Sequence, residues 1–195
     1  MQGLWYGDRR DRVKWGALLQ LTQTRKISCV VQVAYFRHGE DPVLQTPEGD
    51  VTLPAVVWNH FSNLRHIERL GEAAEIEILV LAQPFDPRQR RRYVADVVAR
   101  LCTVETPKIV FLDPDTGMAP STSGPQHVTQ ADAAEIWGAL SVGDLLVVYQ
   151  HGDRTTTWRD DRASSLSAAC SGAPVQVIAG KGVASDVAML WCEKR

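Results

Sequence analysis

The chain has 195 residues, of which 45% are hydrophobic and 23% are charged, which is typical of a soluble globular protein and excludes disordered, collagen-like and coiled-coil chains. The formal net charge of −2 excludes a chain that is basic overall, as many nucleic-acid binders are. No apolar run reaches the roughly 18 residues of a membrane-spanning helix, and residues 1–10 lack the apolar segment of a signal peptide. We therefore expect a cytoplasmic protein with no membrane partner.

The first third of the chain predicts helix, strand, loop and helix in turn. Asp8 is a suitable N-cap for a helix that runs to about Leu21. Residues 27–36 are rich in β-branched and aromatic side chains, which indicates a buried strand. Residues 38–54 contain several prolines and glycines and are expected to form a long loop. Apolar spacing in residues 58–70 then predicts a second helix.

The rest of the chain alternates strands with helices. Apolar runs predict strands at 76–81, 108–112 and 145–149. Helical patterns that begin with the capping residues Asp86 and Thr129 occupy 86–102 and 129–140, and a further helix is expected at 158–170. Two final strands, at 175–179 and 187–192, are suited to antiparallel pairing. Such alternation is typical of a mainly parallel sheet with helices on both faces. We therefore expect residues 1–195 to form a single doubly wound, Rossmann-like α/β domain with a C-terminal antiparallel strand pair.

Ligands of open parallel sheets bind at the carboxyl ends of the strands, and three predicted strand ends are rich in polar residues. They are Asp113-Pro114-Asp115-Thr116-Gly117, Gln150-His151-Gly152-Asp153 and Arg37-His38-Gly39-Glu40-Asp41. If these strands are parallel neighbours, one edge of the sheet gathers the side chains of Asp113, Asp115, His151, Asp153, His38 and Glu40. The same residue types also form ordinary turns, so the sequence leaves both interpretations open.

Two basic clusters contrast with the nearly neutral total charge. One lies close to the N-terminus and the other near the start of the predicted helix at 86–102. If the clusters share a face, that face would attract phosphate groups, although a run of charge more often marks a solvated helix face. The candidate nucleic-acid contacts are Arg9, Arg10, Arg12, Arg90, Arg91 and Arg92.

Several common motifs are missing from the sequence. There is no G-x-x-x-x-G-K-[ST], no G-x-G-x-x-G after the first predicted strand and no G-x-S-x-G. P-loop enzymes, standard dinucleotide-binding proteins and α/β-hydrolases are therefore disfavoured. The four cysteines are widely separated and form no C-x-x-C pair, so we expect small core residues rather than a zinc or redox motif: Cys29, Cys102, Cys170 and Cys192.

The order of elements, with its terminal strand pair, resembles class I S-adenosylmethionine-dependent methyltransferases. In those that methylate amino groups, the fourth strand ends in an Asp/Asn-Pro-Pro-aromatic motif, which Asp113-Pro114 matches in part. The segment from Tyr6 to Trp15 is also similar to the Gly-Asn/Asp-x-x-Asp-x-x-Lys-His segment of the large-subunit ribosomal RNA adenine-N6 methyltransferases. The matching positions are Gly7, Asp8, Asp11 and Lys14, and Trp15 replaces the histidine.

This resemblance implies a methyltransferase-type fold, S-adenosylmethionine as cofactor and an amino group of a nucleic acid as substrate. Asp113 would position the amino group, with Asp115 and His151 as further catalytic candidates. The cofactor side would contain Asp8, Asp11, Lys14 and His38. The chain departs from the family in two places: Asp115 and Thr116 replace the second proline and the aromatic residue, and only one glycine, Gly39, follows the first predicted strand.

Two other functions fit the same residues. In a metal-dependent phosphodiesterase or nuclease, Asp113 and Asp115 would hold Mg²⁺ with a third ligand such as Asp8 or His151, and Lys14 would meet the scissile phosphate. In a non-enzymatic binding module, the basic face and the tryptophans would form a partner surface on a methyltransferase-type fold that has lost its cofactor site.

Overall fold

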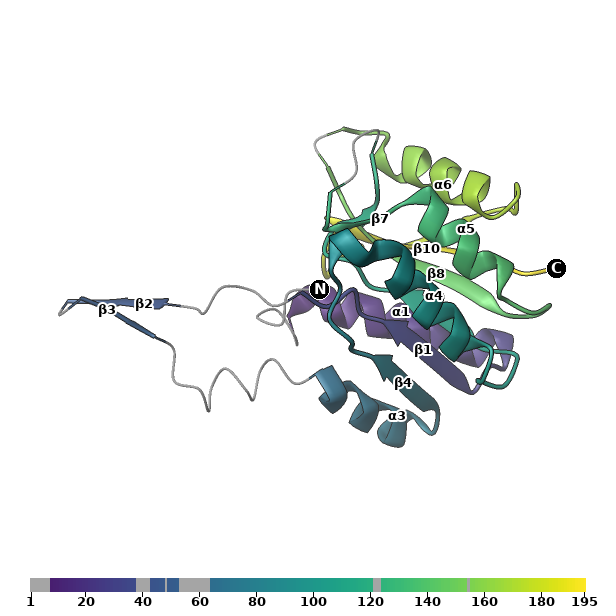
Figure 1. Cartoon of the computed structure of the whole chain (residues 1–195), viewed down its shortest axis with the longest axis horizontal. Coiled ribbons are helices and arrows are strands. Elements are labelled where there is room, and N and C mark those ends of the chain that lie inside the picture. Colours follow the sequence, from purple (N-terminus) through teal and green to yellow (C-terminus); the bar gives the residue numbers. More distant parts are fainter. Residues whose placement is uncertain (1–7, 38–42, 48, 53–63, 121–123, 154) are drawn as a thin grey trace.

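The centre of the molecule is a mostly parallel sheet, with strand order β4-β1-β5-β8-β10-β9 (Figure 1). The computed structural model describes residues 8–37, 43–47, 49–52, 64–120, 124–153 and 155–195. Strand β1 is parallel to β4 and β5, and β5 is parallel to β8, whereas β10 is antiparallel to both β8 and β9. The strands are β1 (Cys29–Val33), β4 (Glu77–Leu81), β5 (Ile109–Leu112), β8 (Leu145–His151), β9 (Gln176–Ala179) and β10 (Val187–Glu193).

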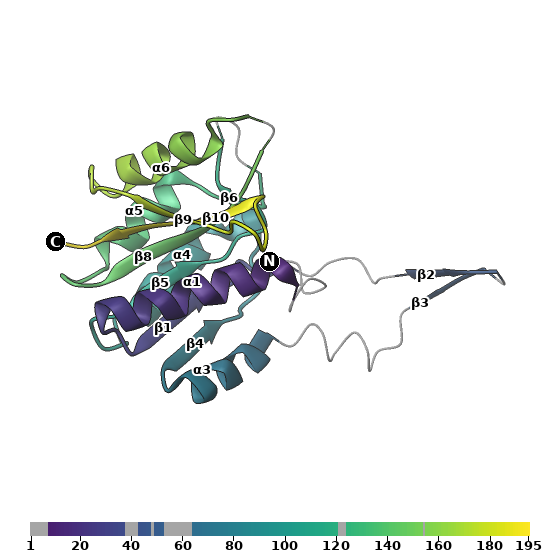
Figure 2. The same cartoon turned by 180° about the vertical axis from the view of Figure 1, so that it is seen from behind.

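Helices cover both faces of this sheet, as Figures 1 and 2 show from opposite sides. Helices α1 (Arg9–Arg25) and α3 (Glu68–Ala74) lie on one face, and a 3-10 helix at Leu64–Ile67 leads into α3. The other face carries α4 (Arg90–Leu101), α5 (Gln130–Gly138) and α6 (Trp158–Ala169). The predicted alternation and the mainly parallel sheet are confirmed.

The hydrophobic core is divided by the sheet into two parts, because successive side chains of a strand point to opposite faces. On β5, Ile109 and Phe111 pack on the side of α1, whereas Val110 and Leu112 pack on the side of α4, α5 and α6. All four are fully buried, which explains why the strand reads as a continuous apolar run. Burial of such a side chain contributes about 1.5–3 kcal/mol, so both helical layers are fixed firmly to the sheet.

The capping predictions for α1 and α5 are confirmed. Asp8 is the N-cap of α1, and its side chain accepts hydrogen bonds from the backbone N–H groups of Arg10 and Asp11 at 2.7 and 3.0 Å. Helix α5 begins with a capping box, in which the side chain of Thr129 accepts from the backbone of Asp132 and the side chain of Asp132 accepts from the backbone of Thr129. Both helices therefore start where the sequence places them.

The loop predicted for residues 38–54 is wrong in part. Its described residues form an antiparallel pair, β2 (Val43–Thr46) and β3 (Gly49–Thr52), which lies apart from the central sheet (Figure 1). Residues 53–63 lie outside the described part of the chain, and with them the start of the helix predicted at 58–70. The described helix there continues beyond that prediction, to Ala74.

Three smaller differences concern lengths and burial. Strand β1 is shorter than the predicted 27–36, because the backbone turns at Tyr35, whose φ is +45°. The expected loop after β5 contains a short parallel pair, β6 (Gly117–Met118) and β7 (His127–Val128). Cys102 is exposed, whereas the other three cysteines are buried as expected.

The predicted pairing at the C-terminus is confirmed, since β9 and β10 are antiparallel, with Ala188 opposite Ala179. Strand β10 also pairs with β8, so it separates β9 from the parallel strands. No helix among the described residues has the length and apolar character needed to cross a membrane. Because β1, β4, β5 and β8 run in one direction, their carboxyl ends share one edge, which is where ligands of such sheets bind.

Candidate functional site

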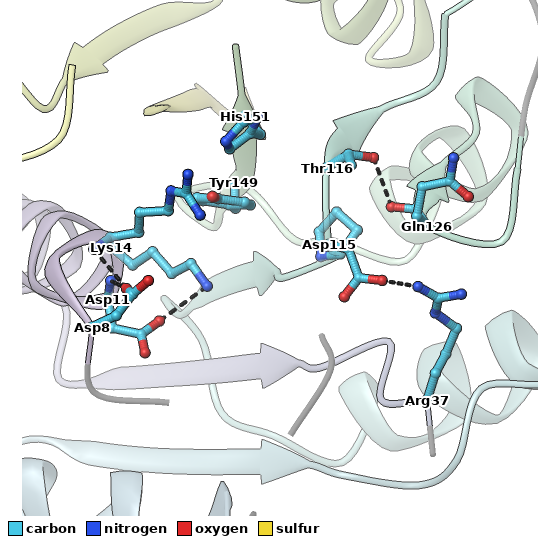
Figure 3. Close-up of a pocket in the computed structure, with 11 residues that line it drawn as sticks. Asp8, Asp11, Lys14, Arg37, Asp115, Thr116, Gln126, Tyr149 and His151 are labelled. Atoms are coloured by element: carbon cyan, nitrogen blue, oxygen red, sulfur yellow. Dashed lines mark hydrogen bonds and ion pairs between the residues drawn. The ribbon is translucent and has the colours of Figure 1, made fainter. Parts of the chain in front are cut away.

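A cavity of about 470 Å³ lies at the carboxyl ends of β5 and β8, beside the start of α1 (Figure 3). Its volume falls in the range of roughly 300–1,000 Å³ that is usual for small-molecule sites. Helix α1 supplies one wall, the segments that follow β1 and β5 supply the opposite wall, and the end of β8 lies between them. The lining residues are Asp8, Arg10, Asp11, Lys14, Arg37, Pro114, Asp115, Thr116, Gln126, Tyr149 and His151.

The Lys14 side chain is 9% exposed and is held by two carboxylates. Its Nζ lies 3.1 Å from Oδ1 of Asp11 and 2.9 Å from Oδ1 of Asp113, and it lies over the ring of Tyr149 at 4.3 Å from the centroid. Burial alone would lower the pKa of Lys14, but the charges of Asp113 and Asp11 outweigh it and the pKa is raised. Lys14 is therefore a permanent cation.

Asp113 lies behind the wall of the cavity and is fully buried. Besides its contact with Lys14, its Oδ2 accepts a hydrogen bond of 2.8 Å from Nε2 of Gln32 on β1. Its backbone N–H donates to the carbonyl of Val33 at 3.0 Å. Asp113 thus joins α1, β1 and β5 beneath the cavity.

Asp115 lies on the cavity wall and has a different partner from Asp113. Its carboxylate forms an ion pair with Arg37, which follows β1 (Figure 3). Burial would raise the pKa of Asp115, but positive charge that includes the Arg37 guanidinium lowers it below the usual value. Asp115 therefore remains ionised at neutral pH.

The segment between Asp113 and Met118 is held in place by the buried side chain of Gln150. Oε1 of Gln150 accepts from the backbone N–H of Met118 at 2.8 Å, and Nε2 donates to the carbonyl of Thr116 at 3.0 Å. Gly117, which lies between these two residues, has φ +111°, and a Cβ there would be 2.3 Å from Oε1 of Gln150. This position therefore requires glycine.

His151 lies at the end of β8, with its ring against the carboxylate of Asp186. Nε2 of His151 is 3.4 Å from Oδ2 of Asp186. Arg10 donates to the same oxygen from Nε at 3.1 Å and from Nη2 at 2.6 Å. Asp186 was not among the predicted site residues; its position directly before the last predicted strand was the only available signal.

Of the strand-end residues that we expected to meet, Asp115 and His151 line the cavity and Asp113 lies behind it. Asp8, Asp11 and Lys14 line the cavity as well, whereas His38 and Glu40 fall outside the described residues. Asp153 is exposed and pairs with Arg162 on α6 at 3.0 Å. Gln126 and Tyr149 line the wall but lie outside the segments that were singled out, and Arg37, from one of those segments, was not predicted as a site residue.

The two basic clusters lie on helices that cover opposite faces of the sheet but begin at the same edge. Three of the six candidate arginines pair with carboxylates of the protein: Arg10 with Asp186, Arg9 with the same carboxylate at 3.9 Å, and Arg90 with Asp132 on α5. The side chains that remain exposed beside this edge are those of Arg9, Arg12, Arg91 and Arg92.

A second cavity of about 400 Å³ adjoins the first and shares Arg37 with it. Its other lining residues are Pro125 and four residues of the segment after β4. Apart from Asp86 they are apolar: Pro84, Phe85, Pro87 and Pro125. The two cavities therefore differ in character, since the first is lined by charges of both signs and the second by prolines and a phenylalanine.

The described residues contain no group of three or more His, Cys, Asp or Glu side chains that could hold a metal ion. The carboxylates of Asp113 and Asp115 are instead bound by separate cations, Lys14 and Arg37. This geometry gives the magnesium hypothesis no support.

No known family profile matches the chain, and no curated protein matches its sequence. A solved structure of a candidate methyltransferase from Thermobifida fusca YX is similar to it, with a TM-score of 0.46 and 11% sequence identity. The similarity covers 96% of this chain and 81% of the other.

We expect Lys14→Met to lower the free energy of unfolding by about 3–5 kcal/mol, because the buried carboxylate of Asp113 loses its cation. Urea denaturation measures the change, and Lys181→Met, at an exposed lysine, is the control. The double variant Lys14→Met/Asp113→Asn should recover part of the loss, since no unpaired charge is left. A stability equal to that of the wild type in Lys14→Met would contradict the buried ion cluster.

Gly117→Ala should destabilise the protein by about 1–3 kcal/mol, because it combines a positive φ with a clash against Gln150. Gly16→Ala is the matched control: Gly16 lies inside α1 with open space around its Cα, so alanine there should stabilise by about 0.5–1 kcal/mol. Thermal denaturation of both variants measures the two changes in stability, which should be opposite in sign. An unchanged or increased stability in Gly117→Ala would show that Gln150 does not fix this segment as described.

Proposed function

We propose that the protein is a methyltransferase-like enzyme that transfers a methyl group from S-adenosylmethionine to an amino group in the charged cavity. The observation that carries this proposal is the 2.9 Å contact between Lys14 and Asp113. These residues belong to the two segments that carry the sequence resemblance, and the segments are far apart in the chain. Chance turn and cap sequences have no reason to meet in one cavity, whereas parts of one active site do.

The residues around the two cavities are suited to the two ends of S-adenosylmethionine, which supplies the methyl group. Its amino-acid end carries both charges, and the first cavity offers Arg10 and Arg37 for the carboxylate and Asp8 or Asp11 for the ammonium group. Its adenosine end is flat and weakly polar, which suits the prolines and Phe85 of the second cavity. Arg37 lines both cavities, so one elongated ligand would pass beside it.

The turn after β1 differs from the glycine-rich turn of the family. Tyr35 stands there with φ +45°, and its ring is buried against Phe85 and Tyr93 with centroids 5.2 Å away from each. Side chains, rather than a glycine-rich backbone, would therefore hold the cofactor in this chain. We propose in addition that the fold is of the doubly wound, methyltransferase type.

We assign to Asp115 the binding of the substrate's amino group. Its carboxylate lies on the cavity wall and stays ionised, so it can accept a hydrogen bond from the amino group that is methylated. Lys14 and Asp113 are positioning residues, because their contact fixes the segment that carries Asp115 against α1. An oriented acceptor of this kind holds the nitrogen lone pair toward the methyl group.

A nucleic acid is the substrate class that we propose. Arg9 and Arg12 lie exposed at the start of α1, and Arg91 and Arg92 at the start of α4, so exposed cations lie on both sides of the edge that holds the cavity. Phosphates bound there would place a base of the same strand over the opening. An enzyme that modifies such a base must take it out of the stack.

S-adenosylmethionine at a hundredfold excess over its Kd should raise the free energy of unfolding by about 2.7 kcal/mol. Arg37→Gln, which changes both cavities, should reduce this stabilisation strongly, whereas the control Arg100→Gln, at an exposed site in the last turn of α4, should keep it. Differential scanning calorimetry measures both. No stabilisation of the wild type at millimolar ligand would refute the cofactor.

Binding of a labelled single-stranded RNA should weaken as salt rises. Arg91→Gln/Arg92→Gln should reduce the slope of log K against log [salt] by about 0.7 for each phosphate that the protein no longer neutralises. Fluorescence anisotropy at several salt concentrations measures the slope, again with Arg100→Gln as control. A slope that the double variant leaves unchanged would rule out phosphate binding by these arginines. RNA binding without cofactor binding would instead support the non-enzymatic module.

A further inference from the structure

We infer that His151 is the proton acceptor of the cavity and that Asp186, with Arg10, is the positioning group that orients it. This inference rests on the proposed function and adds a step to it. When an amino nitrogen forms a bond to the methyl carbon, the bond between that carbon and the sulfonium sulfur breaks and its electron pair stays on sulfur. The nitrogen then carries a positive charge, and one N–H proton must leave for the product to become neutral.

Three other ionisable groups near the cavity are poor proton acceptors. Lys14 is a permanent cation between Asp11 and Asp113. Asp115 is held in its ionised form by positive charge that includes Arg37, and a carboxylate with a lowered pKa binds a proton weakly. Burial raises the pKa of Tyr149, so its phenol stays neutral. His151 lines the same cavity, and a neutral imidazole has a ring nitrogen whose lone pair can accept a proton.

The orientation of His151 is fixed by the neighbouring strand β10 and the residue before it. Strand β10 places Val187 opposite His151, and the N–H of Gly152 donates to the carbonyl of Asp186 at 2.7 Å. The carboxylate of Asp186 therefore lies beside the imidazole, with Oδ2 at 3.4 Å from Nε2. This contact favours the tautomer with the proton on Nε2, which leaves the lone pair of Nδ1 to accept a proton.

Arg10 is the third residue of this group, and it holds the carboxylate of Asp186 in place. Its Nε and Nη2 both donate to Oδ2 of Asp186, and it reaches that oxygen from the first turn of α1. Burial would raise the pKa of Asp186, but the hydrogen bonds and charge of Arg10 outweigh this and the pKa is lowered. Asp186 is thus an anion that can stabilise the imidazolium ion formed when His151 takes the proton.

The interaction itself can be tested without any methyl transfer. In ¹⁵N-labelled protein, the His151 signal, assigned by its loss in His151→Gln, should show the Nε2–H tautomer with a slowly exchanging, downfield Nε2 proton. Asp186→Ala should abolish that proton signal, whereas Asp160→Ala, at an exposed carboxylate of α6, should leave it unchanged. Circular dichroism verifies that each variant is folded. A proton on Nδ1, or a Nε2 signal unaffected by Asp186→Ala, would overturn the inference.

The chemical role is tested with tritiated S-adenosylmethionine and an adenine-containing single-stranded RNA. We expect His151→Gln to lower kcat by about 10²–10⁴-fold, and Asp186→Ala to lower it by a smaller factor with little change in KM. The double variant should be no slower than His151→Gln alone, because the two residues act as a unit. Additive losses would overturn the inference. No transfer by the wild type would refute the proposed function and the proton-accepting role, and the NMR result would still decide the Asp186–His151 interaction.

Discussion

The cavity depends on one buried cation. Lys14 lies almost out of contact with water, and a lone ammonium group in that place would lose several kcal/mol of hydration. Two carboxylates compensate: Asp11, one turn earlier on α1, and Asp113, at the end of β5. Because separating these charges would cost free energy, the start of α1 is held over the end of β5. The charged cavity exists because those two elements cannot move apart without leaving a buried charge unpaired.

This arrangement also explains why two aspartates separated by one residue have different tasks. Asp113 directly follows β5 and is buried, and its carboxylate contacts Lys14 and Gln32 within the protein. Asp115 follows Pro114 onto the cavity wall, where positive charge that includes the Arg37 guanidinium keeps it ionised. A pair of carboxylates aimed at a shared ion would need both to face one point. Here the interior cation has drawn one of them away, which leaves a single carboxylate for hydrogen bonding to a ligand.

The sequence predicts the site as far as local patterns extend. The buried runs identify β5 and β8, and the rule for strand ends then brings Asp115 and His151 to one edge. The sequence does not predict Asp186. Its place beside His151 depends on β10 lying between β8 and β9, and the similar apolar content of β9 and β10 does not specify that strand order. The strands β2 and β3 were missed because Pro47 and Gly49 suggested a loop, whereas Pro47 directly follows β2 and Gly49 is the first residue of β3. Arg10 and Arg90 were counted as free cations because their partners, Asp186 and Asp132, are distant in sequence.

The pairing of charges bears on which ligand enters and which stays outside. Close to the cavity the cations Lys14, Arg10 and Arg37 all have carboxylate partners, so the interior offers both signs at short range and little net positive field. A ligand that itself carries both charges can exchange contacts with these pairs, whereas a polyanion would meet Asp8, Asp11 and Asp115 at the same time. The exposed side chains of Arg12 on α1 and of Arg91 and Arg92 on α4 lie outside these charge pairs. The proposed phosphate contacts therefore belong at the rim and the proposed zwitterionic ligand inside, a division that a chain with a net charge of −2 can achieve by the placement of its charges.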